Sequence, residues 1–531
     1  MSSSIHSLTR LSKSALALLC LSFSVSACAR NPVPTTASNT PQPSASPLAS
    51  ATPNSHSEPG LAVLPADISA EPKAAEEAEE DCQVAQTASR RFLPRTSVPP
   101  IDRILPATEN DCGFYNWGWQ TFLFATQLGS NRQPTFLNYS SFESVFDLSE
   151  TELLSKFSTT DSDLYNARRF RVNALASASR LPLLNGGFKQ AGEAGAMLID
   201  QNRNAVFYSI HINPNFAEFV EQNQLNNLPK LLQESNGGGV PTDLEFPPGA
   251  LELKAAWKIV EPGEDVSHYF TRRARVPLLK NAGQQVIATG GSREVNLALI
   301  GLHVVGVVQD HPEFIWATFE HVDALGRRDL APVAKTNPLP GMPQTPQELE
   351  TLLQKYPLFG LATPVSLANQ QPAQHTVEAR SQKFQAATSV FRVFPASLSK
   401  QAEEDQALKT LNAHMGELFA SSDPSGQDLR RNYRMVGAVW IDQPGSKDPN
   451  GVFKANRSFE NTPEHTLLAG EDALSSMAME SFTQQSAPNC FSCHNTTRKM
   501  ILPDQFFPAR RINVSNALTF FAQAKLLGNA P

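Results

Sequence analysis

Residues 295–308 read Val-Asn-Leu-Ala-Leu-Ile-Gly-Leu-His-Val-Val-Gly-Val-Val. Most of these residues are apolar and many are β-branched, and such side chains are enriched in strands. Similar stretches occur at 251–260, 268–279 and 314–322, with turns rich in Gly, Pro and Asp between them. Connections this short favour antiparallel strands, because a parallel pair needs a long crossover. The sequence therefore predicts an antiparallel sheet or sandwich at the centre of the molecule.

Helices are expected on either side of this strand-rich region. Residues 197–200 and 205–212 flank a turn and predict a hairpin, and residues 435–442 predict a further strand. The segments expected to be helical are 113–128, 141–158, 345–355, 397–420, 471–485 and a final helix capped by Ser515 and ended by Gly528. The predicted fold class is α+β, an antiparallel β-rich central domain with flanking helices and a short helical C-terminal segment.

The N-terminal residues are typical of a bacterial secretion signal. Arg10 and Lys13 precede an apolar stretch of about a dozen residues, which is too short to span a bilayer. The stretch ends in Val25-Ser-Ala-Cys28, which resembles the lipobox of bacterial lipoproteins, where the cysteine becomes the lipid-modified first residue. Ordinary cleavage after Ala27 is the alternative. We expect a signal peptide over residues 1–27 and a lipid anchor on Cys28.

The rest of the chain divides by composition. Residues 28–90 are rich in Pro, Ser, Thr and Ala and predict a disordered tether. Residues 91–465 are expected to form a β-rich globular domain with helical insertions, and residues 466–531 a helical segment packed on it. Ala29, rather than Asp, follows Cys28, so the lipobox resemblance implies the periplasmic side of the outer membrane. A secreted or soluble periplasmic protein is the alternative, and a net charge of −7 does not favour a nucleic-acid partner.

The cysteines carry the most specific signal in the chain. Cys82 and Cys112 are candidates for a disulfide in an oxidising periplasm. Cys490-Phe-Ser-Cys493-His494 is C-x-x-C-H, the attachment signature of a c-type haem. In this chemistry two thiols add to the two vinyl groups at one porphyrin edge, and the following histidine is the proximal iron ligand. The sequence thus predicts that Cys490, Cys493 and His494 bind one covalent haem c.

Other interpretations of this motif fit less well. A thioredoxin-like pair needs a βαβ context, and a structural zinc site needs a second pair of Cys or His nearby. A plain local disulfide does not explain the adjacent His494. Because the motif occurs once, we expect one haem, held by the segment 466–531. One helix after the motif cannot enclose a haem, so the upstream domain must form much of the pocket.

Several segments together resemble a family of bacterial secreted monohaem proteins described as cytochrome c family proteins. The resemblance spans roughly residues 110–500 and implies haem c binding, without implying a substrate. The segments that carry it are Trp119-Gln-Thr-Phe122, Glu252-Leu-Lys-Ala-Ala-Trp257, Gly301-Leu-His-Val-Val305, Phe314-Ile-Trp-Ala-Thr-Phe-Glu-His-Val-Asp323, Met479-Glu-Ser-Phe-Thr-Gln484 and Cys490-Phe-Ser-Cys-His-Asn495. Relatives often carry Ser-His near the C-terminus, whereas here Asn516 follows Ser515, so no histidine is available there and the sixth iron ligand stays open.

Met479, on the helix expected before the motif, is a candidate for that second axial position. A thioether ligand raises the reduction potential, as in electron-transfer cytochromes. Met477 lies two residues earlier, and packing in the core is the alternative for both residues. Two basic pairs, Arg498-Lys499 and Arg510-Arg511, flank the haem segment. They are expected to be solvated or to neutralise the haem propionates.

A second group of candidates lies on neighbouring predicted strands. If these side chains line one pocket, they can bind a metal, ligate the iron or act as acid and base near it. Satisfied histidines in an apolar core are the alternative. The residues are His303, His321, Glu320 and Glu252, with His211 at the end of a third strand.

Three functions follow from these observations. The first is a membrane-anchored periplasmic cytochrome that passes single electrons to an unidentified redox partner. The second is a haem-dependent oxidoreductase of the peroxidase or oxygenase type with an open distal site, and the third is a haem-based sensor. The single C-x-x-C-H motif argues against a dihaem peroxidase. Whether the protein is an enzyme is left open at this point.

Overall fold

The structure is a computed structural model, and it describes residues 111–159 except 131, 180–322 except 193, 194 and 310, 357–358, 368–391, 401–440, 469–470, 474–484 except 475, and 490–528. The predicted signal peptide, Cys28, the tether and the helix expected at 345–355 lie outside these residues. Within them, no helix is both long enough and apolar enough to cross a membrane.

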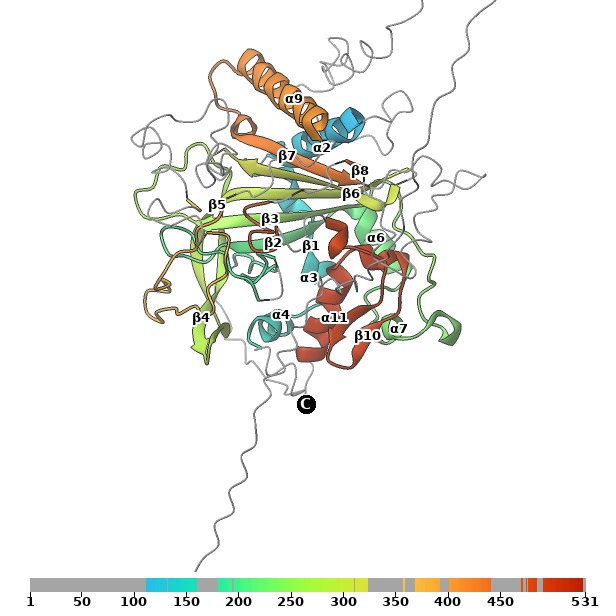
Figure 1. Cartoon of the computed structure of the whole chain (residues 1–531). Helices are drawn as coiled ribbons and strands as arrows, with labels where there is room; N and C mark the ends of the chain where they lie inside the picture. Colours follow the sequence, from blue (N-terminus) through green and yellow to red (C-terminus); the bar gives the residue numbers. More distant parts are fainter. Residues whose placement is uncertain are drawn as a thin grey trace, which may run out of the picture.

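An antiparallel sheet of eight strands dominates the described residues (Figure 1). Its order is β1–β2–β3–β5–β6–β7–β8, and β4 pairs with β5 outside this path. The strands are β1 (Ser140–Ser141), β2 (Phe207–Ile212), β3 (Leu251–Ile259), β4 (Thr271–Ala282), β5 (Gln285–Val308), β6 (His311–His321), β7 (Tyr433–Trp440) and β8 (Ala469–Gly470). The prediction of an α+β fold around an antiparallel sheet is confirmed.

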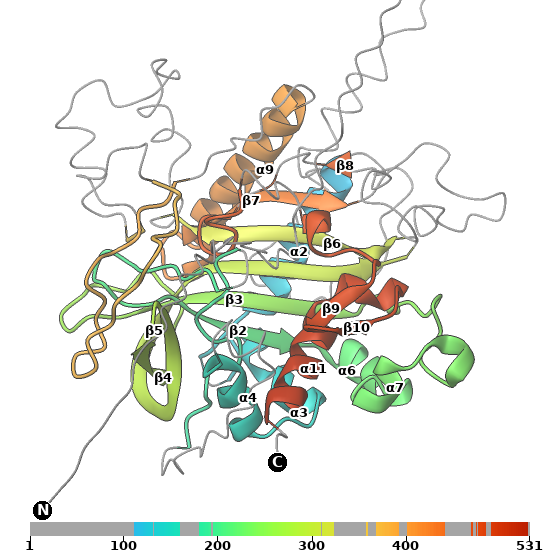
Figure 2. The same ribbon diagram turned by 60° about the horizontal axis from the view of Figure 1, so that its bottom comes forward.

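β5 is long enough to pair with different strands along its two halves. Its second half pairs with β3 and β6, whereas its first half pairs with β4. Gly283, with a φ of +62°, lies in the tight turn that joins β4 to β5, where a left-handed backbone favours glycine. The register between β3 and β5 shifts at Ala256 and Trp257, and such a bulge increases the local twist. Figure 2 shows the β4–β5 hairpin bending away from the central strands.

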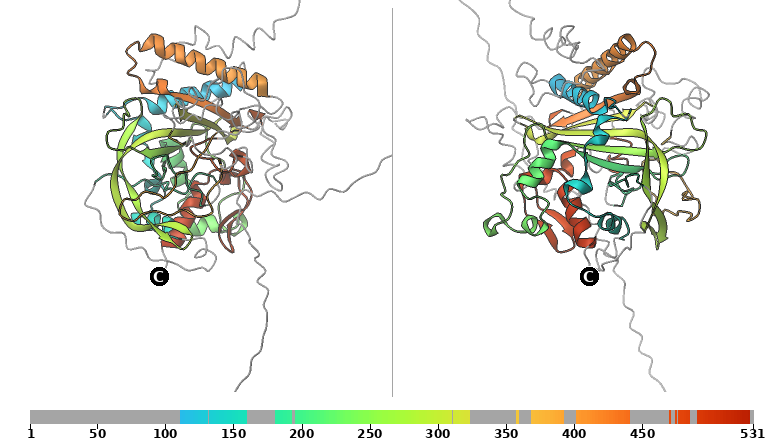
Figure 3. Two further views of the ribbon diagram at one scale, coloured as in Figure 1. Left: turned by 60° about the vertical axis from the view of Figure 1, so that its left-hand side comes forward. Right: turned by 180° about the vertical axis from the view of Figure 1, so that it is seen from behind.

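Helices cover both faces of the sheet (Figures 1 and 3). On one face lie α2 (Asp111–Thr126) and α9 (Gln401–Ser422). On the other lie α4 (Glu150–Phe157), α11 (Ala517–Gly528) and the hairpin of β9 (Lys499–Leu502) and β10 (Gln505–Phe507). The remaining helical elements are α3 (Phe142–Val145), α6 (Pro214–Gln222), α7 (Leu228–Leu232) and the 3-10 turns η2 (Thr135–Asn138), η3 (Ser235–Gly237), η6 (Leu429–Asn432), η8 (Cys490–Ser492) and η9 (Arg511–Val514).

Aromatic contacts fix α2 to the sheet. The Phe122 ring stacks on the Phe319 ring of β6 with centroids 4.2 Å apart, and Trp119 meets the same Phe319 ring edge-on at 5.0 Å. Gly118 permits this approach, because a Cβ there would lie 2.9 Å from the Cβ of Ala317. All three rings are buried, so α2 and the sheet share one apolar core.

The expected helix at 141–158 is in fact two helices, α3 and α4. Asp147, between them, has a φ of +50°, which a right-handed helix does not allow. Ser149 then caps α4. Its hydroxyl accepts a hydrogen bond from the Glu152 backbone N–H, and the Glu152 carboxylate accepts one from the Ser149 backbone N–H. This capping box begins a new helix, so the prediction of one continuous helix was wrong.

Two further expectations differ from the structure. The hairpin expected at 197–212 is present but shorter: the Ile199–Ala205 bridge is flanked by backbone hydrogen bonds from Asp200 to Asn204 and from Val206 to Leu198, and beyond it β2 pairs with β1 and β3. The helix expected at 471–485 is wrong, since the described residues 476–484 form turns. Contacts between these turns and side chains of the sheet explain the difference, as shown below.

Candidate functional site

Three rows of side chains on one face of the sheet define the candidate site. Cross-strand pairing places Lys254, His303 and Thr318 directly opposite one another on β3, β5 and β6. The adjoining rows are Glu252, Val305 and Trp316 on one side and Tyr208, Ala256, Gly301 and Glu320 on the other. Since directly paired residues point to the same face, these side chains are neighbours.

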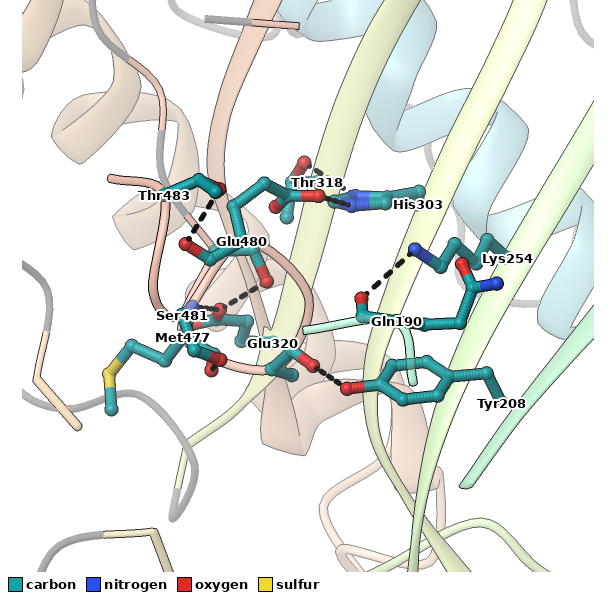
Figure 4. A network of polar contacts seen from close by, with 12 residues as sticks. Gln190, Tyr208, Lys254, His303, Thr318, Glu320, Met477, Glu480, Ser481 and Thr483 are labelled. Atoms are coloured by element: carbon teal, nitrogen blue, oxygen red, sulfur yellow. Dashed lines mark hydrogen bonds and ion pairs between the residues drawn. The ribbon is translucent and has the colours of Figure 1, made fainter. Parts of the chain in front are cut away.

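His303 lies in the middle of this face and makes two polar contacts (Figure 4). Its Nδ1 lies 2.8 Å from the Thr318 hydroxyl, and its Nε2 lies 2.9 Å from Oε1 of Glu480. Glu480 comes from the turns at 476–484, which lie beside this face of the sheet (Figure 4). Burial raises the pKa of Glu480, but His303, Lys254 and His494 outweigh it and hold that pKa below its usual value. Glu480 is therefore a carboxylate at neutral pH.

Side chains of the sheet also hold the turn residues just before Glu480. Glu320 is fully buried, and its Oε1 accepts hydrogen bonds from the Ser476 hydroxyl (2.8 Å) and the Met477 amide (2.7 Å). The Tyr208 hydroxyl donates to the Ala478 carbonyl at 2.7 Å. Backbone groups that a helix would pair internally are thus paired with the sheet, which is why the expected helix does not form.

We expect Glu320→Ala to loosen these turns without unfolding the sheet. The change leaves the buried Met477 amide without its acceptor, at a cost of about 1–3 kcal/mol, so the Met477 amide should exchange with solvent roughly tenfold faster or more. Hydrogen exchange of the peptide covering residues 474–484 measures this. Glu320→Gln, which retains an acceptor oxygen, is the matched control and should change exchange less. Equal exchange in all three proteins contradicts the proposed anchoring.

Lys254 interacts electrostatically with two carboxylates, Glu252 and Glu480. Its Nζ donates to the Gln190 carbonyl at 3.4 Å, and Glu252 and Glu480 both favour its charged form. Burial nevertheless lowers the pKa of Lys254. Burial likewise raises the pKa of Glu252. The Ser515 hydroxyl donates to Glu252 Oε2 at 2.7 Å and acts in the opposite direction, but it does not outweigh burial. Four ionisable groups, Glu252, Lys254, His303 and Glu480, therefore form one interacting set.

These groups are not part of a solid core. Glu252, Lys254, Glu480 and His494 are only partly buried, and the side chain of Glu480 is 32% exposed. We call the face of the sheet that carries Lys254, His303 and Thr318 the polar face.

The C-x-x-C-H residues form a single turn beside the polar face. The amides of Cys493 and His494 both donate to the Cys490 carbonyl, at 3.2 and 2.8 Å, and Phe491 is buried in the main core. His494 packs on Trp316, with ring centroids 4.0 Å apart. Trp316 is directly opposite Val305 in the row that contains Glu252. The tertiary structure thus brings the motif to the face that carries the ionisable set.

The surroundings of His494 select one form of its ring. Its Nδ1 lies 2.9 Å from the Val514 carbonyl, which can only accept, so Nδ1 carries the proton. Burial, aided by the nearby Lys499 charge, lowers the pKa of His494 to about 3. The ring is therefore neutral at physiological pH, with Nε2 as its unprotonated nitrogen. This is the form in which histidine binds metals, and the carbonyl contact is a common second partner of such ligands.

The basic residues near the motif have structural roles. Arg510 is buried and donates to the carbonyls of Leu231 and Gln233, and Arg511 pairs with Glu245. The expectation that this pair is solvated or free for propionates is therefore wrong. Lys499 donates to the Cys493 carbonyl, and burial lowers the pKa of Lys499 to about 7. Arg498 is exposed and lies over the Phe506 ring.

Not all of the predicted site residues meet. His303, Glu320 and Glu252 share the face described above, whereas His321 packs on the Tyr269 ring at 3.7 Å and contacts the His268 carbonyl at 3.1 Å. His211 pairs with Leu253, whose neighbour Lys254 lies on the polar face, so His211 points to the opposite face. There it contacts the Ser209 hydroxyl at 3.0 Å.

Met477 and Met479 are buried in a hydrophobic cluster that is separate from the one containing Phe491. The methyl group of Met479 lies against Gly301, where a Cβ would be 3.4 Å away. These contacts are those of core residues. Among the described residues, no group of three or more His, Cys, Asp or Glu side chains is arranged to hold a metal ion.

The structure shows the disulfide state of only some of the cysteines, because the others lie outside the described residues. Cys493 is disulfide-bonded in this structure. Cys82 and the side chain of Cys112 lie outside the described residues, so the predicted Cys82–Cys112 disulfide stays a prediction. Because thioether formation consumes both thiols of the motif, haem attachment requires the disulfide at Cys493 to be reduced first.

Comparisons of the chain with protein-family models, with curated proteins and with solved structures found no match. The site is therefore interpreted from its own geometry. Sequence reasoning missed Lys254, Thr318 and Glu480. A signal was present for Lys254, a charged residue inside a strand whose neighbours Leu253 and Ala255 are apolar and buried. Glu480 carried no such signal, because its position depends on the fold of the turns.

Proposed function

We propose that this protein is a periplasmic, lipid-anchored c-type cytochrome that binds one covalent haem at Cys490, Cys493 and His494 and transfers single electrons. The observation that carries the proposal is the state of His494. Its ring is neutral, its Nδ1 proton is held by the Val514 carbonyl, and it directly follows a turn that contains both cysteines. This arrangement leaves Nε2 to bind iron.

The proposed haem c attaches once the disulfide at Cys493 is reduced. The turn at 490–494 keeps the two cysteines and the histidine on one short segment, and His494 is only partly buried. Lys499 holds the Cys493 carbonyl, while Trp316 supports the His494 ring. A haem c bound here supplies a one-electron couple at its iron. The protein orients the axial imidazole, keeps it neutral and packs the turn against the sheet.

We include in this proposal the location of the protein at the outer membrane and its membership of the secreted monohaem cytochrome c family. Cys28 anchors the chain to the periplasmic side of the outer membrane, and residues 28–90 tether the folded part. This compartment is where bacteria attach haem to C-x-x-C-H motifs. The resemblance to secreted monohaem cytochrome c family proteins supports the assignment through the motif and the segments quoted above.

A haem-dependent oxidoreductase is a second candidate, which one observation favours. His303 and Glu480 form a hydrogen-bonded pair on the polar face, with Lys254 beside them, and His494 packs on Trp316 of the same face. A histidine and a carboxylate in such a position can transfer protons to and from a bound substrate. Electron transfer alone does not require them.

The visible spectrum of the ferrous protein, with and without carbon monoxide, distinguishes these functions. We expect bands of a low-spin haem that carbon monoxide leaves unchanged, because both axial positions of an electron-transfer haem are filled. A spectrum shifted by carbon monoxide shows an open sixth position and favours the oxidoreductase or a sensor. The absence of haem bands after expression with the haem-attachment machinery contradicts both.

A further inference from the structure

Residues 368–391 form a strap along the outer edge of β4, the edge that does not pair with β5. Gln382 takes the place of a neighbouring strand there. The Leu279 N–H donates to its Oε1 at 2.7 Å, and its Nε2 donates to the Leu279 carbonyl at 3.1 Å. Asn281 acts in the reverse direction, since its side chain pairs with the N–H and the carbonyl of Val377, at 2.9 Å each. Two side-chain amides thus cover this part of the edge.

The strap is fastened on its other side to the hairpin at 199–205. The Phe384 N–H donates to the Arg203 carbonyl of this hairpin at 2.8 Å. Between residues 371 and 387, the apolar side chains that the strap buries are Val377 and Phe384. A segment held mainly by polar contacts opens at a lower cost in free energy than the core of the protein.

Asp200, in the turn of the same hairpin, has a buried carboxyl group of which one oxygen is paired. Its Oδ1 accepts the Asn204 backbone N–H at 2.8 Å, whereas its Oδ2 is buried and has no hydrogen-bond partner among the described residues. Burial raises the pKa of Asp200 to about 7, and neither the Asn204 hydrogen bond nor the nearby positive charges outweigh burial. In water the pKa of an aspartate is about 3.9, so the closed structure favours the protonated form.

Charged groups face Asp200 from the sheet and from the strap. Lys258, near the end of β3, forms an ion pair with Glu264, and Lys383, on the strap, forms one with Glu261. The two ammonium groups favour the ionised form of Asp200, whereas Glu261 disfavours it. Because each ammonium group already has a carboxylate partner, ionisation of Asp200 adds a buried charge without a partner of its own.

We propose that residues 368–391 are a pH-sensitive strap, which stays closed over the edge of β4 while Asp200 is protonated and opens more often once Asp200 is ionised. Opening lets water reach the Asp200 carboxylate, which the closed structure keeps desolvated. Opening also uncovers the N–H and the carbonyl of Leu279, groups to which a further strand can pair. The strap does not depend on haem attachment.

Proton linkage sets the direction of this effect. The closed strap binds the proton of Asp200 more tightly than the open strap, in which the carboxyl group is hydrated. The equilibrium constant for closing should therefore fall as the pH rises from about 4 to about 7, by at most about tenfold per pH unit, and should stay constant above that range.

Hydrogen exchange of the full chain tests the strap, with protection calculated against the intrinsic exchange rate at each pH. Peptides covering residues 376–391 should lose about tenfold or more of their protection between about pH 5 and about pH 8, and peptides covering β3 should change much less. Asp200→Asn, which keeps an acceptor for the Asn204 N–H but cannot ionise, should abolish the difference. Asp243→Asn, at an exposed aspartate outside the strap and the hairpin, is the matched control and should retain it.

Equal protection of the strap at both pH values overturns the proposal, as does a difference that persists in Asp200→Asn. If that variant does not fold, carboxyl NMR of the unmodified protein with labelled aspartate replaces it. One aspartate must titrate near pH 7, and the lack of such a signal overturns the proposal. Gln382→Ala, which removes both hydrogen bonds to Leu279, should open the strap at either pH, and unchanged protection in this variant overturns the proposal as well.

Discussion

Changing Cys490 and Cys493 to alanine together is expected to abolish covalent haem while the sheet stays folded. Both thioether bonds depend on these two sulfur atoms, so the effect should be complete rather than partial. The turn contributes Phe491 to the core through a side chain that the double variant keeps. Haem staining after denaturing electrophoresis and the intact mass of the protein measure the loss, and far-UV circular dichroism reports the sheet.

The other cysteine pair provides the matched control. Cys82→Ala with Cys112→Ala should retain covalent haem, because neither residue belongs to the C-x-x-C-H motif. Haem that survives denaturation in the Cys490 and Cys493 double variant contradicts the assigned attachment site. A disulfide at Cys493 that persists in protein expressed with the attachment machinery contradicts it as well, because the same sulfur cannot form a thioether.

Phe319→Ala is expected to destabilise the whole described domain by about 3–5 kcal/mol. Phe319 is fully buried, and its ring stacks on Phe122 and meets Trp119 edge-on, so its removal leaves a cavity between α2 and the sheet. Urea unfolding followed by tryptophan fluorescence measures the change, and Trp119 reports directly on the altered contact.

Leu128→Ala is the control for this prediction. Leu128 is 50% exposed, and its truncation should change stability by no more than about 0.5 kcal/mol. A loss below about 1 kcal/mol for Phe319→Ala means that α2 does not depend on the aromatic contacts for its position. Haem content should be unchanged in the control.

The proposed site combines residues that are adjacent in the sequence with residues that are far apart in it. The motif at 490–494 belongs to the first kind, because five successive residues form the turn. The ionisable set is dispersed over β3, β5 and the turns at 476–484. His494 joins the two parts by packing on Trp316.

The sequence alone determined the elements whose signals are local. The apolar, β-branched run at 295–308 required a buried strand, and the short connections required antiparallel pairing. The five residues 490–494 carry the proposal of haem attachment. Local signals were also present where the interpretation failed: Ser149 and Glu152 mark a helix start inside the segment that was expected to be one helix.

Only the tertiary structure decided which side chains meet. His303 and His321 lie on neighbouring strands, yet only His303 lies on the polar face, because alternation along each strand and the bulges in the sheet set the direction of every side chain. The residues 476–484 became turns because Glu320 and Tyr208 compete for their backbone groups. Contacts between residues more than 150 positions apart depend on register and packing, which no short stretch of sequence contains.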